Sequence, residues 1–308
     1  MKIAVFDNVA FKFSQVLIDH WQSLGHIVVK DKGFDPKICV DADVLFFDWA
    51  DQNIQRASNP ADKIWEQIGG QQLLDKHVIV RAHDVECWIG QPSTIKWEWA
   101  QDLIFVADHV RRFTDSYMHF AERYPHLKVH LIKHGVDAEK FTLRQDLTPN
   151  KKIATIGVWN DKKNLEMGLA ILAELPRDYE WHVVAKELRH WRRAYVMDYI
   201  DRLKLNVTLY DHVPDVNIFL EDKSIFLATG MKEAFAQVVG ESSLKGLKPI
   251  VRRFYGYENV WPQEWGWDTV SEAKELILGD YFPHVYRRCI EVNYPLQKML
   301  EEYDKLLI

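Results

Sequence analysis

Two glutamates, Glu233 and Glu241, lie eight positions apart in a segment, 232–250, that connects two apolar runs. The pattern predicts a loop holding Glu233, then a short helix holding Glu241. The first N–H groups of a helix have no partner within it, and the helix dipole favours an anion beside them. The segment therefore offers an anion site near two carboxylates, which suits a sugar attached to a diphosphate. Two solvated glutamates in an ordinary strand–loop–helix are the alternative.

Lys162 and Lys163 are a second group suited to phosphate. They lie in a polar loop between a predicted strand and an amphipathic helix with Leu165, Leu169 and Leu172 on one side. A lysine near a helix N-terminus meets phosphate as a compact positive charge. A solvated lysine pair is the alternative, above all for Lys162.

His83 comes at the polar end of a predicted buried strand. Arg81, Asp84 and Glu86 lie in the same short segment. In open α/β sheets, ligand-binding groups collect at the C-terminal ends of the strands. We therefore expect His83 at a ligand site, with a surface loop as the alternative.

The elements that must position these residues alternate between strand and helix. A strand at 2–6, a helix at 14–24 and a strand at 26–29 open one doubly wound unit, and a strand at 151–158 opens a second. A further helix is predicted over 59–69, with Pro60 in its first turn.

Length and composition fit a protein of two domains. The chain has 308 residues, 47% hydrophobic and 27% charged, with a net charge of −6, which argues against a wide nucleic-acid surface. No apolar run reaches the roughly 20 residues that a membrane span needs, and the first residues do not resemble a signal peptide. Cys39, Cys87 and Cys289 are far apart and are expected to be free thiols, so we predict a cytoplasmic location.

The segment 232–250 resembles the donor-binding signature of retaining GT-B glycosyltransferases of family 4. That signature has a Glu, a Phe two residues later, a second Glu separated from the first by seven residues, and a helix ending Gly-x-Pro-hydrophobic. The matching residues are Glu233, Phe235, Glu241, Gly246 and Pro249, although Lys248 separates Leu247 from the proline. Ala234 and Ala236 stand where the family has glycine.

Two further segments resemble the same family. In 128–141, the residues Gly135, Val136, Asp137 and Phe141 match, with His134 in place of Asn. In the loop after residue 156, the residues Gly157, Lys163 and Asn164 match, but Val158 occupies the place of an arginine that commonly grips the diphosphate.

The resemblance implies an α/β chain of the GT-B fold, with two Rossmann-like doubly wound domains facing across a cleft. The domains would be 1–147, on the acceptor side, and 148–289, on the donor side. The C-terminal helix, about 290–308, would cross back to the first domain.

The resemblance also implies an activity: transfer of a sugar from a nucleotide-diphosphate donor, such as a UDP- or GDP-sugar, with retention of anomeric configuration. It implies neither a metal nor an organic cofactor. His83 and Glu233 would be the catalytic residues beside the sugar, and Glu241 would bind the ribose. The remaining donor contacts would come from Lys163, Lys162, the N–H groups of Phe235, Ala236 and Gln237, and the backbone near Val213, which would frame the base.

Two other functions stay open from the residues. One is a GT-B-like sugar-nucleotide epimerase, for which Asp84 or Glu86 would supply acid or base groups. The other is an inactive nucleotide-sugar binder, because the family's arginine is missing. The acceptor is not indicated: a saccharide, a lipid-linked sugar, a protein or a modified nucleic acid would each fit. A basic cluster, Arg189, His190, Arg192 and Arg193, would suit an acidic acceptor or a peripheral membrane contact, or is a solvated helix face.

Overall fold

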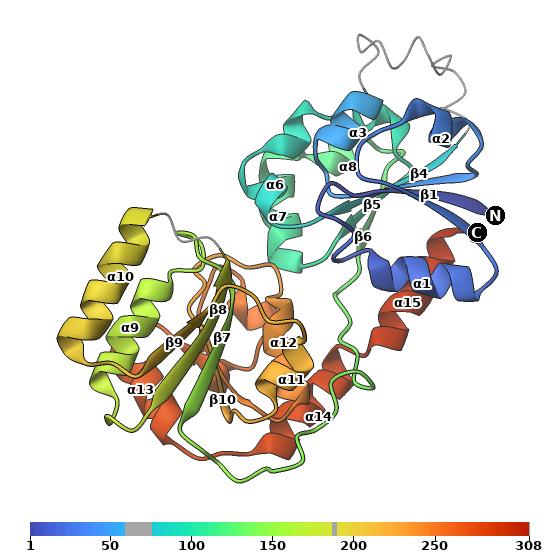
Figure 1. The fold of residues 1–308 in the computed structure, drawn as a ribbon. Helices are drawn as coiled ribbons and strands as arrows, with labels where there is room; N and C mark the ends of the chain where they lie inside the picture. The colour runs from blue at the N-terminus through green and yellow to red at the C-terminus, as the bar shows by residue number, and fades with distance from the viewer. Residues whose placement is uncertain (59–75, 187–189, 308) are drawn as a thin grey trace. The chain divides into compact units, whose positions relative to one another are not determined.

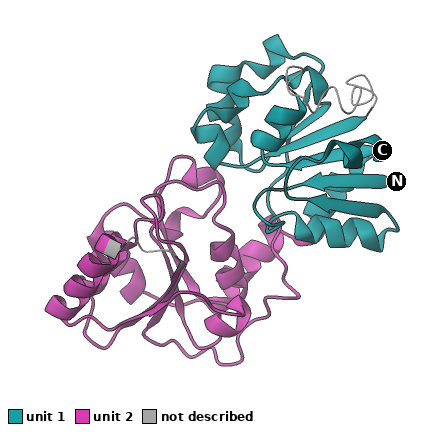
Figure 2. Cartoon of the chain, turned by 45° about the horizontal axis from the view of Figure 1, so that its top comes forward, with its two compact units in different colours: residues 1–134, 297–308 teal, residues 135–296 magenta. Residues whose placement is uncertain are grey.

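The computed structural model describes residues 1–58, 76–186 and 190–307. The helix predicted over 59–69 and the side chains of Arg189 and His190 lie outside the described residues. The chain forms two compact units, residues 1–134 with 297–308 and residues 135–296 (Figure 2). The sequence had placed the boundary at 147/148 and the returning helix from about 290.

Unit 1 is built on a sheet of six parallel strands in the order β2-β1-β3-β4-β5-β6. Figure 1 labels β1, β4, β5 and β6 of this sheet. The four inner strands, β1, β3, β4 and β5, are mostly buried, as expected for a parallel sheet covered on both faces, whereas the edge strands β2 and β6 are partly exposed. The strands are β1 (Lys2–Phe6), β2 (Ile27–Asp31), β3 (Val44–Asp48), β4 (His77–Ala82), β5 (Asp102–Phe105) and β6 (Lys128–Leu131).

The helices of unit 1 connect and cover this sheet. The first, α1 (Gln15–Ser23), buries Leu17, Ile18 and Trp21. Ser14 precedes it, but its hydroxyl donates to Asp7 Oδ2 at 2.7 Å and does not cap the helix. The others are α2 (Pro36–Val40), α3 (Gln52–Ala57), α6 (Val85–Trp88), α7 (Asp108–Met118), α8 (Phe120–Arg123) and most of α15 (Leu296–Asp304), with short 3-10 turns at Gln91–Thr94, Trp97–Trp99 and Lys305–Leu307.

Unit 2 has a second six-stranded parallel sheet, in the order β12-β11-β10-β7-β8-β9. The edge strand β12 lies in an aromatic stretch, 255–267. It is only two residues long, which is too short for a periodic signal. The strands are β7 (Lys152–Val158), β8 (Glu180–Lys186), β9 (Val207–Tyr210), β10 (Ile225–Ala228), β11 (Lys248–Arg252) and β12 (Gly266–Trp267).

Helices cover both faces of this second sheet. The bounds are α9 (Leu165–Glu174), α10 (His190–Leu203), α11 (Val216–Leu220), α12 (Gln237–Leu244), α13 (Val270–Leu278) and α14 (Pro283–Asn293), with 3-10 turns at Tyr257–Asn259 and Gln263–Trp265. None of the helices in the described part of the chain is long and apolar enough to cross a membrane.

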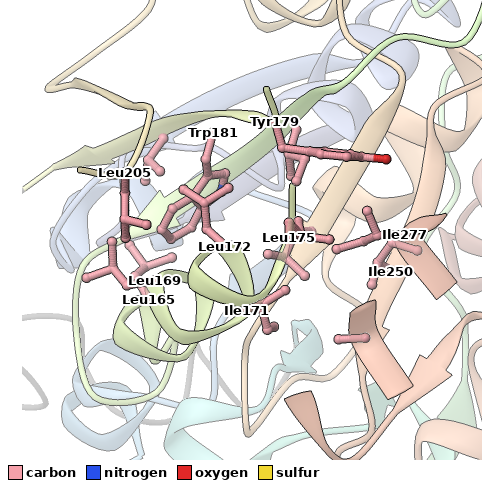
Figure 3. Packing of buried hydrophobic residues seen from close by; sticks show 14 of the residues in the cluster. Leu165, Leu169, Ile171, Leu172, Leu175, Tyr179, Trp181, Leu205, Ile250 and Ile277 are labelled. Carbon is pink, nitrogen blue, oxygen red and sulfur yellow. The ribbon is translucent and has the colours of Figure 1, made fainter. Parts of the chain in front are cut away.

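The core on one face of the unit 2 sheet confirms the predicted apolar side of α9. Leu165, Leu169 and Leu172 are buried against Trp181 and its neighbours (Figure 3). Gly168 permits this contact, because a Cβ at that position would lie 2.3 Å from the Trp181 ring.

The fold class is therefore α/β, with two doubly wound parallel sheets. In each sheet the order of strands reverses at one place. In unit 2 this place lies between β7 and β10, and in unit 1 between β1 and β3. Ligands of open α/β sheets bind beyond the C-terminal ends of the strands at such a reversal.

Candidate functional site

Lys163 and Glu233 form an ion pair at the strand-order reversal of unit 2. Lys163 lies in the loop after β7 and Glu233 in the loop after β10. Lys163 Nζ is 2.6 Å from Glu233 Oε1, and Lys162 Nζ is 4.0 Å from Oε2. Glu233 is nearly buried, while about a quarter of each lysine side chain is exposed. The sequence had assigned these three residues to one donor site from two separate segments, and the structure places them in contact.

The two loops are also joined through their backbones. The N–H of Met231 donates to Lys162 O at 2.9 Å, and Thr229 Oγ1 donates to Lys163 O at 2.7 Å. The side chain of Lys163 extends over Gly157, where a Cβ would be 3.6 Å from it. The lysine loop is therefore held against the glutamate loop by its main chain, independently of the ion pair.

The helix α12 begins directly after the Glu233 loop. Its N-cap, Ala236, has φ +59°, in the left-handed region, and alanine has no polar side chain to cap the first N–H groups. Phe235 is buried against the rings of Trp261 and Tyr294, both at 4.8 Å between centroids. The Phe235 side chain therefore anchors the loop, and only its backbone is suited to contact a ligand.

The remaining predicted donor residues lie on α12 or in the loop after β9. Gln237, the first residue of α12, is partly exposed and donates from Nε2 to Gly135 O at 3.4 Å. Glu241, one helical turn further, is also partly exposed. Val213 lies in the loop after β9 and packs on the core with part of its surface exposed.

The 135–141 motif has structural roles within unit 2. Val136 packs on Gly240 of α12, where a Cβ would be 2.8 Å from Val136 Cγ2. Asp137 Oδ1 accepts hydrogen bonds from the N–H groups of Glu139 and Lys140, and Phe141 is buried in the core. The motif therefore fixes a turn and supports the helix that carries Glu241.

His83 lies at the end of β4 in unit 1 and is only 3% exposed, which excludes the surface-loop alternative. Its Nε2 is 2.7 Å from Asp48 Oδ1, at the end of β3. Arg81 donates to the same carboxylate from Nε at 2.6 Å and from an η nitrogen at 2.7 Å. The ring of Trp49 stacks on the His83 ring, with centroids 4.0 Å apart.

The other acidic residues proposed beside His83 are buried. Glu86 Oε1 accepts from the His83 N–H at 2.6 Å and from the Ala50 N–H at 3.3 Å. Burial raises the pKa of Glu86. Asp84 precedes α6 but makes no side-chain cap to it. Glu86 thus links the ends of β3 and β4, which is a structural function.

Sequence reasoning did not single out Asp48 and Trp49, which contact His83, or Asp51, which caps α3. They follow the apolar run of β3 just as His83 follows β4, so the strand-end rule would have found them. Burial raises the pKa of Asp51 to about 7, and the nearby charges of Glu86 and Asp48 add to the effect.

The described arginines of the predicted basic cluster are paired with acids. Arg192 bridges Asp161, in the lysine loop, and Glu166 of α9, both at 2.5 Å, and Arg193 lies 3.6 Å from Asp211. Within residues 1–58, 76–186 and 190–307, no three His, Cys, Asp or Glu side chains form a group that could hold a metal ion.

Comparison with known proteins supports the fold. Neither a family model nor a curated protein matches the sequence. Among solved structures, Anabaena HepE in complex with UDP has a TM-score of 0.73 at 12% identity, covering 100% of this chain and 99% of that one. A glycosyltransferase from Rickettsia africae has a TM-score of 0.64 at 14% identity, covering 99% and 98%. TarM has a TM-score of 0.63 at 12% identity, and the match spans 94% of this chain but only 57% of TarM.

Proposed function

We propose that this chain is a glycosyltransferase that moves a sugar from a nucleotide-diphosphate donor to an acceptor with retention of anomeric configuration. The observation that carries the proposal is the Lys163–Glu233 pair at the strand-order reversal of unit 2, directly before the N-terminus of α12. The likeness to a structure that holds UDP and to one named a glycosyltransferase supports it. We accordingly take a UDP-sugar as the first donor to test.

Each group in this site has a chemical task. Lys163, with Lys162 beside it, would neutralise the diphosphate, and the first N–H groups of α12 would donate to its oxygens. These same groups would stabilise the negative charge that develops on the leaving nucleoside diphosphate.

The acidic residues and His83 would hold the hydroxyl-bearing parts of the donor. Glu233 would accept hydrogen bonds from sugar hydroxyls, and Glu241 from those of the ribose. His83 of unit 1 would contact the sugar, and backbone groups near Val213 would contact the base. Binding of the diphosphate requires Lys163 to share its ammonium group between Glu233 and phosphate.

The experiment is a donor panel measured by calorimetry and followed by product analysis. UDP-glucose, UDP-galactose, UDP-N-acetylglucosamine and GDP-mannose would each be titrated into the protein, then incubated with mixed saccharide acceptors. The expected result is binding of one donor and a new glycoside whose anomeric configuration equals that of the donor.

Each other outcome identifies one of the alternatives. A donor that is isomerised without an acceptor would indicate an epimerase, and a donor that binds without any turnover would indicate an inactive binder. A product of inverted configuration would contradict retention, and failure of every donor to bind would contradict the nucleotide-sugar site itself.

A further inference from the structure

The carboxylate of Asp48 holds two neighbouring side chains of unit 1. Arg81 occupies both of its oxygens, at 2.6 and 2.7 Å, and His83 Nε2 lies 2.7 Å from Oδ1. Asp48 and Arg81 are fully buried, so their opposite charges are screened little by water. Burial acts against the ionised form, but the charge of Arg81 and the hydrogen bonds from His83 and Arg81 lower the pKa of Asp48 below its ordinary value. Asp48 therefore remains a carboxylate.

This contact determines which His83 nitrogen carries the hydrogen. A carboxylate only accepts hydrogen bonds, so the nitrogen that faces it, Nε2, must be the N–H. Neutral imidazole has a single N–H, and Nδ1 therefore keeps its lone pair. In the described part of the chain His83 Nδ1 has no hydrogen-bond partner. A hydroxyl group is the ligand chemistry that such an acceptor suits.

Trp49 fixes the plane of the same ring. Its indole stacks on His83 at 4.0 Å with 22° between the planes. Its backbone adopts φ +106°, which is strained for a bulky residue. The N–H of Trp49 donates to Arg81 O at 2.9 Å, which holds the strained residue at the end of β4. Strain of this kind collects at functional sites.

The arginine that completes the group is itself immobilised. Its guanidinium lies over the rings of Phe46 at 5.5 Å and Tyr303 at 5.6 Å, and Tyr303 Oη is 3.4 Å from an η nitrogen. Tyr303 belongs to α15, so the last helix of the chain supports the residues around His83.

We propose that Asp48 and Trp49 are positioning residues for His83. Asp48 fixes the Nε2–H tautomer and Trp49 fixes the ring plane, so that Nδ1 is presented as a hydrogen-bond acceptor to a hydroxyl of the bound sugar. They lie at the strand-order reversal of the unit 1 sheet, where a ligand site is expected. The identification of the ligand as a sugar rests on the proposed function, whereas the tautomer of His83 does not.

The tautomer is measured directly by nitrogen-15 NMR on the whole protein with labelled histidine, with the His83 signals identified by their loss in His83→Asn. The expected spectrum shows protonated Nε2 and unprotonated Nδ1 at neutral pH. In Asp48→Asn the single tautomer is lost. The matched control is Asp102→Asn, whose carboxylate contacts His77 and His130 at 2.6 Å and which should leave His83 unchanged. An Nδ1–H tautomer in the wild-type protein would overturn the proposal.

Turnover of the donor identified by the panel tests the consequence for function. Asp48→Asn is expected to lower kcat by about tenfold or more, since a small misplacement of a reacting group has effects of this size, while the Kd of the free nucleoside diphosphate stays within about twofold. If that variant does not fold, Trp49→Gly serves, because glycine adopts φ +106° without strain and removes the ring.

The NMR and turnover experiments together distinguish failure of the positioning roles from failure of the proposed function. Wild-type kcat in a folded variant that has lost the tautomer or the ring would overturn the positioning roles. Absence of wild-type turnover with every donor would instead contradict the proposed function, and the tautomer measurement would still decide the geometry.

Discussion

Gly230 lies directly against the carboxylate of Glu233: a Cβ built on it would be 2.3 Å from Oε1, the same oxygen that Lys163 contacts. The glycine therefore provides the space in which the ion pair forms. A backbone feature of the loop after β10 thus determines where the carboxylate that pairs with Lys163 can lie.

Replacing Gly230 by alanine should displace the carboxylate and separate it from Lys163. Because the atom in conflict is the end of a flexible side chain, the free energy of unfolding should change by less than about 1 kcal/mol. Donor affinity should fall by about tenfold, which corresponds to the loss of one charge-assisted hydrogen bond. Calorimetry of the donor with Gly230→Ala measures it. Gly33→Ala, where the nearest atom would be 3.9 Å away, is the control, and equal affinity in both variants would contradict the arrangement.

Ala236→Gly should stabilise the protein. The backbone of Ala236 is left-handed, which costs roughly 1–2 kcal/mol for a residue with a Cβ, and part of the gain from glycine is offset by its freedom in the unfolded chain. We expect about 0.5–1 kcal/mol of net stabilisation, measured as a higher midpoint of urea unfolding.

Ala234→Gly is the matched comparison, because Ala234 lies two residues away and is not among the described residues with positive φ. There the glycine brings only its entropic cost and a lost buried methyl group, so the variant should be less stable than the wild type by about 1 kcal/mol. Equal effects at the two positions would show that backbone conformation does not distinguish them.

Much of the fold could be predicted because it depends on local patterns. The apolar strands, the buried side of α9 and the loop position of Glu233 are visible in spacing and composition. The short strand β12 was not, since two residues carry no period and pair only through the sheet.

The site was predictable in part for a related reason. Strand ends bring residues together at a known edge of the sheet, which is why Lys163 and Glu233 meet. The Asp48–His83 contact depends on side-chain direction between two strands, and the strained φ of Trp49 depends on packing. Residue spacing in the sequence predicts neither the contact nor the backbone conformation.

The stability of unit 1 should decrease as pH rises, through Asp51. Burial raises its pKa to about 7 in the folded state, against 3.8 for the ordinary group. The stabilising contribution is therefore complete below the unfolded pKa and is lost as pH rises through the folded one. At roughly 1.4 kcal/mol per unit the loss between pH 5 and pH 8 is up to about 3 kcal/mol. Urea unfolding at pH 5 and pH 8 measures it.

Asp51→Asn removes this titration while keeping an oxygen to accept from the Asn53 N–H, as Asp51 does at 2.8 Å. Its unfolding free energy should fall by less between the two pH values than that of the wild type. Asp41→Asn, on the surface, should behave as the wild type. A pH dependence of Asp51→Asn identical to that of the wild type would show that another group is responsible.

Lys163→Ala and Glu241→Ala should weaken donor binding in different ways. Lys163 would contact the diphosphate, so its loss should reduce the affinity for the nucleoside diphosphate alone by about 10- to 100-fold. Glu241 would contact the ribose, so its loss should weaken the nucleoside monophosphate and the diphosphate by the same factor. The controls are Lys151→Ala and Glu174→Ala, both in solvent-exposed surface pairs of unit 2. Calorimetry with the two nucleotides separates the roles, and unchanged affinity in both Lys163→Ala and Glu241→Ala would remove the donor site from this edge of the sheet.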